Sequence, residues 1–194
     1  RDAFSNASKR FFPAKGKLPD TLLFSKPQYN TWIELVYNQN QTDILKYARS
    51  IIDNGFPPGV IMIDDNWADY YGRFDFRSDR FTNAAAMVDT LHSMGFKVML
   101  WVSPFVSPDT EVARELLAKK LLLTAYKVKT GNPEKDADEP AIIPWWNGYS
   151  SVLDFTNPDA VKWFKGRLYH MVNPYHLDGF KFDAGDADFY PANV

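Results

Sequence analysis

Continuous apolar runs alternate along this chain with stretches whose apolar residues recur every three to four positions. The runs GVIMID (59–64) and FKVMLWVSP (96–104) have the length and composition of buried strands, and LDGFKFD (177–183) repeats the pattern. The stretches between these runs have the periodicity of amphipathic helices. Apolar strands that alternate with helices indicate a parallel sheet in an α/β fold.

Start and stop signals bound the first and last helices of this pattern. A first strand is predicted at YNTWIELVY (29–37), and an apolar helical stripe follows it, with Asn40 or Thr42 as the cap and Gly55 as the stop. The stretch NPDAVKWFKGRLYHMV (157–172) predicts the last helix, because an asparagine cap precedes a proline at the first helical position.

The middle of the chain carries two further helices and one interruption. A helix is predicted at roughly 83–94, closed by Gly95, and another is expected to open at Ser107 and Pro108 as cap and first-turn proline. Lysines, acids, glycine and prolines then break the rhythm at about 121–150. This segment is interpreted as an insertion on a barrel loop.

Two α/β folds fit a parallel sheet of this kind, an open doubly wound sheet and a (β/α)₈ TIM barrel. No G-x-G-x-x-G follows a strand, which disfavours the dinucleotide-binding version of the open sheet. A barrel needs about 250 residues and eight strands, and this chain offers four. The sequence therefore predicts a lead-in at 1–28 and, at 29–194, the N-terminal half of a TIM barrel of about four β/α units with an inserted loop region.

The composition excludes several classes of protein. No cysteine occurs, so disulfide frameworks and thiol nucleophiles are absent. The 22 basic and 24 acidic residues form no clustered basic face, so no nucleic-acid partner is expected. No run of about 18 apolar residues appears, so no membrane segment is predicted. The aromatic content of 16% is high, and aromatic rings gather in sugar-binding clefts as well as in cores.

Ionisable and aromatic side chains follow the predicted strands at their carboxyl ends, where α/β folds place their ligands. Lys181 and Asp183 are two residues apart on one strand, so both side chains point to the same face. An ammonium beside a carboxylate favours its ionised form, which suits a nucleophile and not an acid. A structural ion pair at the strand end is the alternative, and Asp64 and Asp65 fit either a ligand site or a turn.

Four acids, Asp64, Asp65, Asp183 and Asp186, occur at these strand ends and raise the question of a metal site. Hard cations need several converging oxygens, but Lys181 would compete with a cation beside Asp183. No metal site and no cofactor is therefore predicted. The histidines lie away from the strand ends and are expected to be structural: His92, His170 and His176.

Several motifs resemble glycoside hydrolase family 31, in order and at similar spacing from about residue 29 onward. They are IDDNW with YGRFDF, GFKVMLWVSPFV, WWNGYSSVLDFTNPDAVKWF and KFDAGD. The sequence is most similar to the myogenesis-regulating glycosidase branch, whose members have KFDAGE, RWWNG and IDD. Asp186 departs from that pattern, because it stands where the branch has glutamate.

The resemblance implies a retaining α-glycosidase on a (β/α)₈ barrel, without a cofactor. By motif position, Asp183 is the implied nucleophile and Lys181 the lysine before it. Asp64 matches the aspartate that binds hydroxyls of the terminal sugar. Trp101 and Trp146 match bulky side chains that wall the same sugar.

The branch likeness favours α-galactosides as substrates. Alternatives are an α-glucosidase or α-xylosidase of the same family, or a catalytically inactive carbohydrate-binding module. The acid/base residue is expected downstream, on a later barrel strand, so the remainder of the barrel is required. The resemblance favours a secreted, periplasmic or secretory-pathway location.

Overall fold

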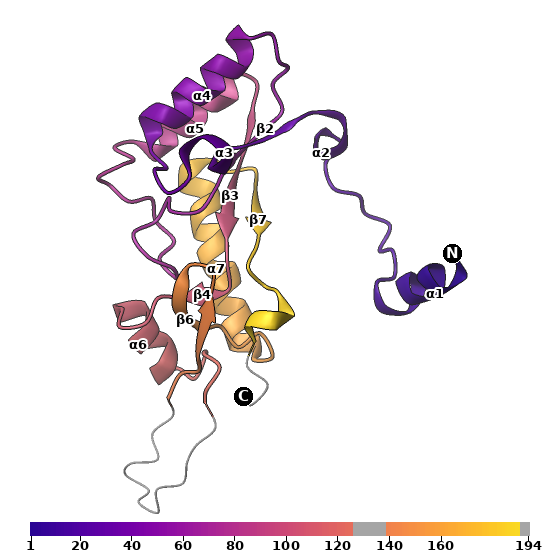
Figure 1. The fold of residues 1–194 in the computed structure, drawn as a ribbon, viewed down its shortest axis with the longest axis vertical. Coiled ribbons are helices and arrows are strands. Elements are labelled where there is room, and N and C mark those ends of the chain that lie inside the picture. The colour runs from indigo at the N-terminus through magenta and orange to yellow at the C-terminus, as the bar shows by residue number, and fades with distance from the viewer. Residues whose placement is uncertain (126–138, 191–194) are drawn as a thin grey trace, which may run out of the picture.

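Four parallel strands form the main sheet, and they lie side by side in the order in which they follow one another along the chain (Figure 1). The sheet consists of β1 (Gln28–Asn30), β2 (Val60–Ile63), β3 (Lys97–Val102) and β7 (Gly179–Phe182). The computed structural model describes residues 1–125 and 139–190. Consecutive parallel strands joined by right-handed crossovers place all connecting helices on one face, as in a barrel wall and unlike a doubly wound sheet.

The helices that cover the sheet begin at side-chain caps. In α4 (Gln41–Asp53) the side chain of Asn40 accepts a hydrogen bond from the backbone of Asp43, which confirms Asn40 as the cap. In α7 (Pro158–Tyr175) Asn157 caps the first turn and proline follows it, as predicted. The helix α5 (Ala84–Ser93) ends before Gly95, whose φ of +91° suits glycine.

One continuous core lies between these helices and the sheet. Alternate strand residues, including Ile61, Ile63, Val98 and Leu100, are fully buried and point toward the helices. The helices contribute their apolar stripes to the same cluster: Ile44, Ala48, Ile51, Met87, Val88, Leu91, Leu116, Phe164 and Met171. This packing fixes the positions of the strands and of the polar residues at their carboxyl ends.

The opposite face of the sheet carries the residues of the candidate site. In the strand register Trp101 pairs with Lys181, and Met62 pairs with Met99, so these side chains share the face that the helices leave open. At the β7 edge Phe182 is 66% exposed, and β7 pairs only with β3 among the described strands. The described residues therefore form part of a barrel wall that is not closed.

The predicted first strand is wrong for most of its length. Only the beginning of YNTWIELVY belongs to β1, and α3 (Trp32–Leu35) follows at once. The chain turns at Thr31, whose buried hydroxyl donates to Gln39 and accepts from the backbone of Asp64. These bonds end the strand despite the apolar and β-branched residues that follow it.

The predicted start of the third helix is also wrong. The helix α6 (Glu111–Ala118) begins after Thr110, whose side chain accepts from the backbone of Ala113. Ser107 is engaged elsewhere, because its hydroxyl accepts from the backbone N–H of Tyr71 and its own N–H donates to the Tyr71 carbonyl. A tertiary contact therefore takes the residue that the local pattern marked as a cap.

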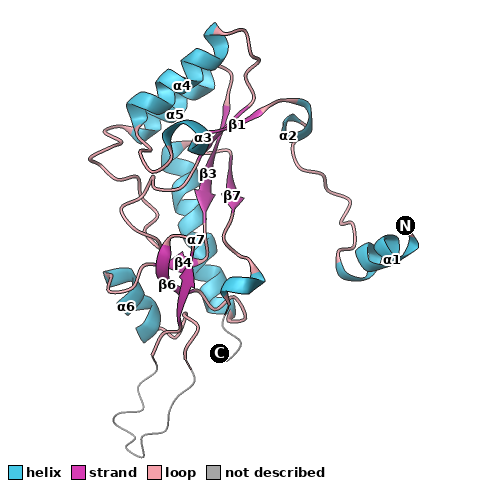
Figure 2. Ribbon diagram, viewed as in Figure 1, coloured by secondary structure: helices cyan, strands magenta, loops and turns pink. Residues whose placement is uncertain are grey.

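A small antiparallel sheet stands below the main sheet at the carboxyl ends of the strands (Figure 2). Its strands are β4 (Phe105–Val106), β5 (Ile142–Trp145) and β6 (Gly148–Val152), in the order β4-β6-β5. The described part of the predicted insertion contributes β5 and the start of β6 to this sheet, and 126–138 lies outside the described residues. The insertion therefore folds back against the candidate site.

The first 25 residues lie apart from the sheet. They include α1 (Asp2–Phe11) and α2 (Leu22–Ser25), neither of which has a buried residue, and Figure 1 shows α1 well away from the strands. A 3₁₀ helix, η1 (Ala187–Phe189), follows β7 at the other end of the chain. In the part of the chain that the structure describes, no helix is long and apolar enough to cross a membrane.

Candidate functional site

The ammonium group of Lys181 lies between two carboxylates at the carboxyl ends of β2 and β7. Its Nζ is 3.0 Å from Oδ2 of Asp64 and 3.1 Å from Oδ2 of Asp183. The Asp64 side chain is almost fully buried, whereas the side chains of Lys181 and Asp183 are each 34% exposed. The convergence expected from strand alternation is present, and Asp183 is the more accessible of the two acids.

Three donors surround the Asp183 carboxylate. The indole Nε1 of Trp101 donates to Oδ2 at 2.9 Å, and the backbone N–H of Ala184 donates to Oδ1 at 2.9 Å. Partial burial alone would raise the pKa of Asp183, but these two bonds and the Lys181 ammonium outweigh it, so its pKa lies below the usual value. Asp183 is therefore ionised over a wide pH range.

The two carboxylates hold Lys181 in its charged form. Burial by itself would lower the pKa of Lys181, but hydrogen bonds to Asp64 and Asp183 outweigh it and raise the pKa. A charged ammonium at this position favours the ionised form of Asp183, which then carries no proton to donate. The cluster therefore has the electrostatics of a nucleophile and not of an acid.

The backbone that follows Asp183 turns sharply. Ala184 has a φ of +60°, a left-handed conformation that is uncommon for a residue with a Cβ, and it is 1% exposed. It packs in a small apolar cluster with Trp101, Phe105 and Trp145. The Ala184 side chain thus packs on the buried side of the turn, and the backbone N–H of Ala184 orients the Asp183 carboxylate.

Asp64 is held from several sides. Its Oδ2 accepts from Nδ2 of Asn30 at 2.7 Å as well as from Lys181, and its Oδ1 accepts from the backbone of Asp65 at 2.9 Å. Its own N–H donates to Thr31 at 3.0 Å. A carboxylate that accepts from three donors is a fixed acceptor with lone-pair capacity left on Oδ1.

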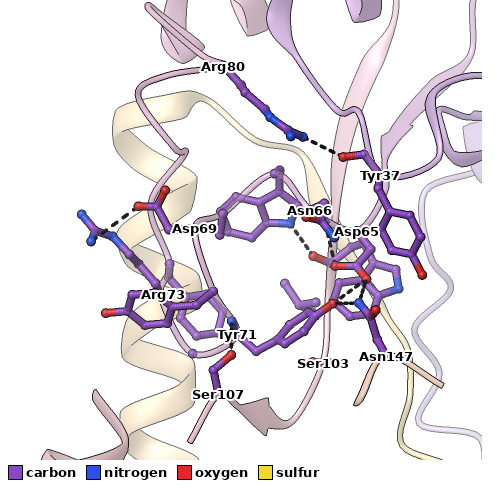
Figure 3. Close-up of a pocket in the computed structure, with 17 residues that line it drawn as sticks. Tyr37, Asp65, Asn66, Asp69, Tyr71, Arg73, Arg80, Ser103, Ser107 and Asn147 are labelled. Carbon is purple, nitrogen blue, oxygen red and sulfur yellow. Dashed lines mark hydrogen bonds and ion pairs between the residues drawn. The ribbon is translucent and has the colours of Figure 1, made fainter. Parts of the chain in front are cut away.

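The neighbouring acid, Asp65, belongs to a separate network. Its Oδ2 accepts from the hydroxyl of Tyr71 at 2.7 Å and from Nδ2 of Asn147 at 3.2 Å, and Asn147 also donates to the Tyr71 oxygen (Figure 3). Burial raises the pKa of Asp65 despite these bonds, and burial also raises the pKa of Tyr71. This network joins the loop after β2 to the hairpin of β5 and β6.

Trp146 lies in the turn of that hairpin, between β5 and β6. The residue is 53% exposed, and its ring centroid lies 5.2 Å from that of Trp145 and 5.4 Å from that of Phe189. Phe189 belongs to the segment that follows Asp183. Trp146 therefore packs against the segment that follows Asp183, and its predicted contact with a sugar stays a prediction.

A cavity of about 560 Å³ opens beside the cluster, and its wall includes Asp65, Tyr71, Trp101, Ser103 and Asn147 (Figure 3). Of the groups that bond to the Asp183 carboxylate the wall includes Trp101 but neither Lys181 nor Ala184, so the cavity and the carboxylate cluster do not coincide. The ion-paired groups, and not the cavity, have the chemistry of a reaction centre. The cluster lies on the open face of the sheet.

No metal centre is assembled in the described parts of the chain. No group of three or more histidine, aspartate or glutamate side chains there lies close enough to hold an ion. Asp65 points into its own network, and Asp186 is exposed. The ammonium of Lys181 takes the space between Asp64 and Asp183 where a cation would bind.

The histidines contact aspartates at the surface, away from the cluster. His92 contacts Asp178 at 2.8 Å, at the amino end of β7, and Asp178 also accepts from Lys97. The other two pair with exposed aspartates: His170 with Asp75 and His176 with Asp89. The His92 and His176 contacts join α5 to the segment between α7 and β7, and the His170 contact joins α7 to the loop after β2.

The sequence profile of the glycosyl hydrolases family 31 TIM-barrel domain matches residues 22–193, which include both sides of this cluster. The chain belongs to glycoside hydrolase family 31. It is 33% identical over 183 residues to the myogenesis-regulating glycosidase of Mus musculus, which covers 94% of this chain and 24% of that protein. It is 23% identical to the alpha-xylosidase XylQ of Lactiplantibacillus pentosus, over 81% of this chain and 20% of that enzyme.

Solved structures of the family share this fold. The GH31 dextranase of Flavobacterium johnsoniae complexed with glucose superposes with a TM-score of 0.66 and 26% sequence identity, over 81% of this chain and 18% of that one. The chain spans about a quarter or less of the length of these relatives. The chain therefore matches part of the TIM-barrel domain of this family, which confirms the predicted fold class.

Two parts of this candidate site were missed by sequence reasoning. Trp101 was expected only as a wall of the sugar site, but its indole N–H donates to Asp183. Tyr71 and Asn147 were not singled out, although both contact the buried Asp65. The only signal available was that Asn147 lies within the WWNG motif and Tyr71 within YGRFDF, both of which carried the resemblance.

Proposed function

We propose that this chain supplies the nucleophile and part of the sugar site of a retaining α-glycosidase that acts on α-galactosides. The observation that carries the proposal is the position of Lys181 between Asp64 and Asp183, with the Trp101 indole as a further donor to Asp183. This arrangement keeps one partly exposed carboxylate ionised, as a nucleophile requires.

The proposed reaction proceeds in two steps. A carboxylate oxygen of Asp183 attacks the anomeric carbon and forms a glycosyl ester while the bond to the leaving oxygen breaks. Water then attacks the same carbon and releases Asp183 and the free sugar. Both steps need a second carboxyl group about 5–5.5 Å away as acid and then base. We assign that group to the remainder of the barrel, because Asp64 is held as an acceptor by three donors.

Asp64 and the tryptophans are proposed to bind the sugar. The buried Asp64 carboxylate keeps acceptor capacity on Oδ1, and hydroxyl groups of a terminal sugar are suitable donors. Trp101 and the exposed Trp146 offer flat rings of the kind that stack on the apolar patches of a pyranose. Lys181 contacts both acids and fixes their relative positions, so we assign it a part in both binding and catalysis.

The choice of α-galactosides rests on the likeness to the myogenesis-regulating glycosidase branch. Alpha-xylosidase and alpha-glucosidase are the names of other relatives, so these activities are the rival substrates. A chromogenic panel of α-galactoside, α-glucoside and α-xyloside, assayed on the whole protein, separates the three. Turnover of α-xyloside or α-glucoside alone contradicts the galactoside assignment, and binding without turnover of any substrate supports an inactive carbohydrate-binding module.

The nucleophile is tested by trapping. An activated fluorosugar that forms a slowly hydrolysed ester should label the peptide that contains Asp183, which mass spectrometry identifies. Asp183→Asn should abolish turnover and leave glycoside binding largely intact, because it removes a group that acts in the transition state. The matched control is Asp188→Asn, an exposed acid in the same segment. Normal turnover in the Asp183 variant would refute the assignment.

A further inference from the structure

We propose that Asp65, Tyr71 and Asn147 form a latch that positions Trp146 at the glycoside site. The inference rests on the proposed function, because Trp146 has a role only if a sugar binds beside it. The three residues are positioning residues, since they act through the hairpin turn and not on the substrate. The latch joins the residue after Asp64 to the residue after Trp146.

The contacts of the latch are mutual. The Tyr71 hydroxyl donates to Asp65 at 2.7 Å, Asn147 donates to the same carboxylate oxygen at 3.2 Å, and Asn147 also donates to the Tyr71 oxygen. Figure 3 shows the three side chains pointing toward one another from separate segments. Each group satisfies the other two, so the loss of one leaves two polar groups with fewer partners.

Burial makes the latch costly to open. Asp65 is 4% exposed, and burial has already raised its pKa, which reflects how poorly the charge is solvated there. The hydrogen bonds of Tyr71 and Asn147 replace water around that carboxylate. The backbone of Tyr71 is fixed as well, because its N–H and C=O both bond to Ser107.

The geometry of the hairpin transfers this constraint to Trp146. Residues Trp146 and Asn147 form the turn, and Gly148 follows with a φ of +103°, which glycine adopts without strain. A turn of two residues leaves little freedom between neighbours. Fixing the Asn147 side chain therefore limits where the Trp146 ring can lie.

Aromatic packing holds the same hairpin from the other side. The Tyr71 ring contacts Trp145 with centroids 4.9 Å apart, and it lies 6.0 Å from Trp101, the donor to Asp183. Trp146 in turn packs against Phe189, in the segment after Asp183. The loops that carry Asp65 and Asp183 thus meet at one hairpin, and the latch is its polar attachment.

Two variants open the latch without touching the carboxylate cluster. Tyr71→Phe removes the shared hydroxyl and keeps the ring, and Asn147→Ala removes the hairpin's contribution. The matched controls are Tyr29→Phe, which removes the hydroxyl bond to the Pro57 carbonyl, and Asn54→Ala, which removes the two side-chain bonds to Ser50. All four are made in the whole protein.

The first measurement is backbone hydrogen exchange of residues 142–152. Both latch variants should exchange faster there by about threefold or more, and both controls should match the native protein. Exchange is independent of turnover. Faster exchange in a protein that turns over no glycoside refutes the proposed function and leaves the attachment of the hairpin standing; unchanged exchange in an active enzyme refutes the latch.

The second measurement is steady-state kinetics on the best glycoside. We expect KM to rise about three- to tenfold in each latch variant with kcat within about twofold, because the latch serves binding by Trp146. Trp146→Ala should raise KM, and adding Asn147→Ala to it should raise KM no further. Multiplication of the two KM effects in the double variant would overturn the proposal, since it would show that Asn147 acts independently of Trp146.

Discussion

The indole Nε1 of Trp101 donates a hydrogen bond of 2.9 Å to Oδ2 of Asp183, between side chains on the open face of neighbouring parallel strands. The bond joins a residue within β3 to the residue that follows β7. It gives Trp101 an electrostatic role, since the donor faces the oxygen that also contacts Lys181. A tryptophan that merely walled the sugar would need no such bond.

The Trp101 bond predicts a change in the pH profile of the whole enzyme. Trp101→Phe keeps an aromatic ring and removes one of the donors that lower the pKa of Asp183, so the pKa should rise. A nucleophile must be ionised, so the acid limb of kcat/KM should move to higher pH. At neutral pH we expect kcat/KM to fall by only about fivefold, because the bond is partly exposed and solvent screens it. An acid limb that does not move would show that Trp101 has no electrostatic role.

Asp64 is predicted to act on binding. Asp64→Ala removes an acceptor for sugar hydroxyls, at a cost of roughly 1.5–3 kcal/mol for a charged hydrogen bond, or about 10- to 150-fold in Kd. Glycoside binding measured by calorimetry on the Asp183→Asn background isolates this effect from turnover. Asp79→Ala, which removes an exposed acid paired with Arg77, is the control. Equal affinity in both variants would contradict the role of Asp64.

The sequence predicted the regular part of the fold because strand and helix periodicities have local causes. The runs at β2, β3 and β7 and the caps Asn40 and Asn157 lie where the patterns placed them. The two errors have a tertiary cause, since Thr31 and Ser107 bond to residues far along the chain. The local residue pattern gives no information about partners that are distant in the sequence.

The candidate site divides in the same way. Strand alternation is enough to bring Lys181 and Asp183 to one face, so that pair could be predicted from spacing. The contact of Asn147 with Asp65 could not, because it depends on how an irregular insertion folds back onto the β2 loop. The residue types gave no warning, since an asparagine in a turn is ordinary.

Stability at low pH should depend on Asp178, at the amino end of β7. Burial alone would raise its pKa, but bonds from Lys97, the backbone of Val98 and His92 outweigh it and lower the pKa. The folded-state pKa therefore lies below the unfolded value. The resulting stabilisation is present above the ordinary aspartate pKa of 3.8 and is lost as the pH falls through the lowered folded-state value.

Asp178→Asn should remove that stabilisation. We expect the free energy of unfolding of the whole protein at pH 7 to fall by about 1–2 kcal/mol, with a smaller difference from the native protein at a pH well below 3.8. Urea unfolding at both pH values measures the effect, with Asp188→Asn as the control. A difference that stays the same at low pH would assign the loss to packing and not to charge.

Residues 1–194 alone should not hydrolyse glycosides. Among the described strands β1 pairs only with β2, and β7 only with β3, so two sheet edges need the rest of a barrel to pair with them, and Phe182 at the β7 edge is 66% exposed. Asp183 would also lack an acid, and a leaving oxygen that is not protonated departs slowly. Purified 1–194 and the whole protein, assayed on the same α-glycoside panel, test this. Turnover by 1–194 that disappears with Asp183→Asn would place the acid within this segment, with Asp186 and Asp188 as the first acids to replace.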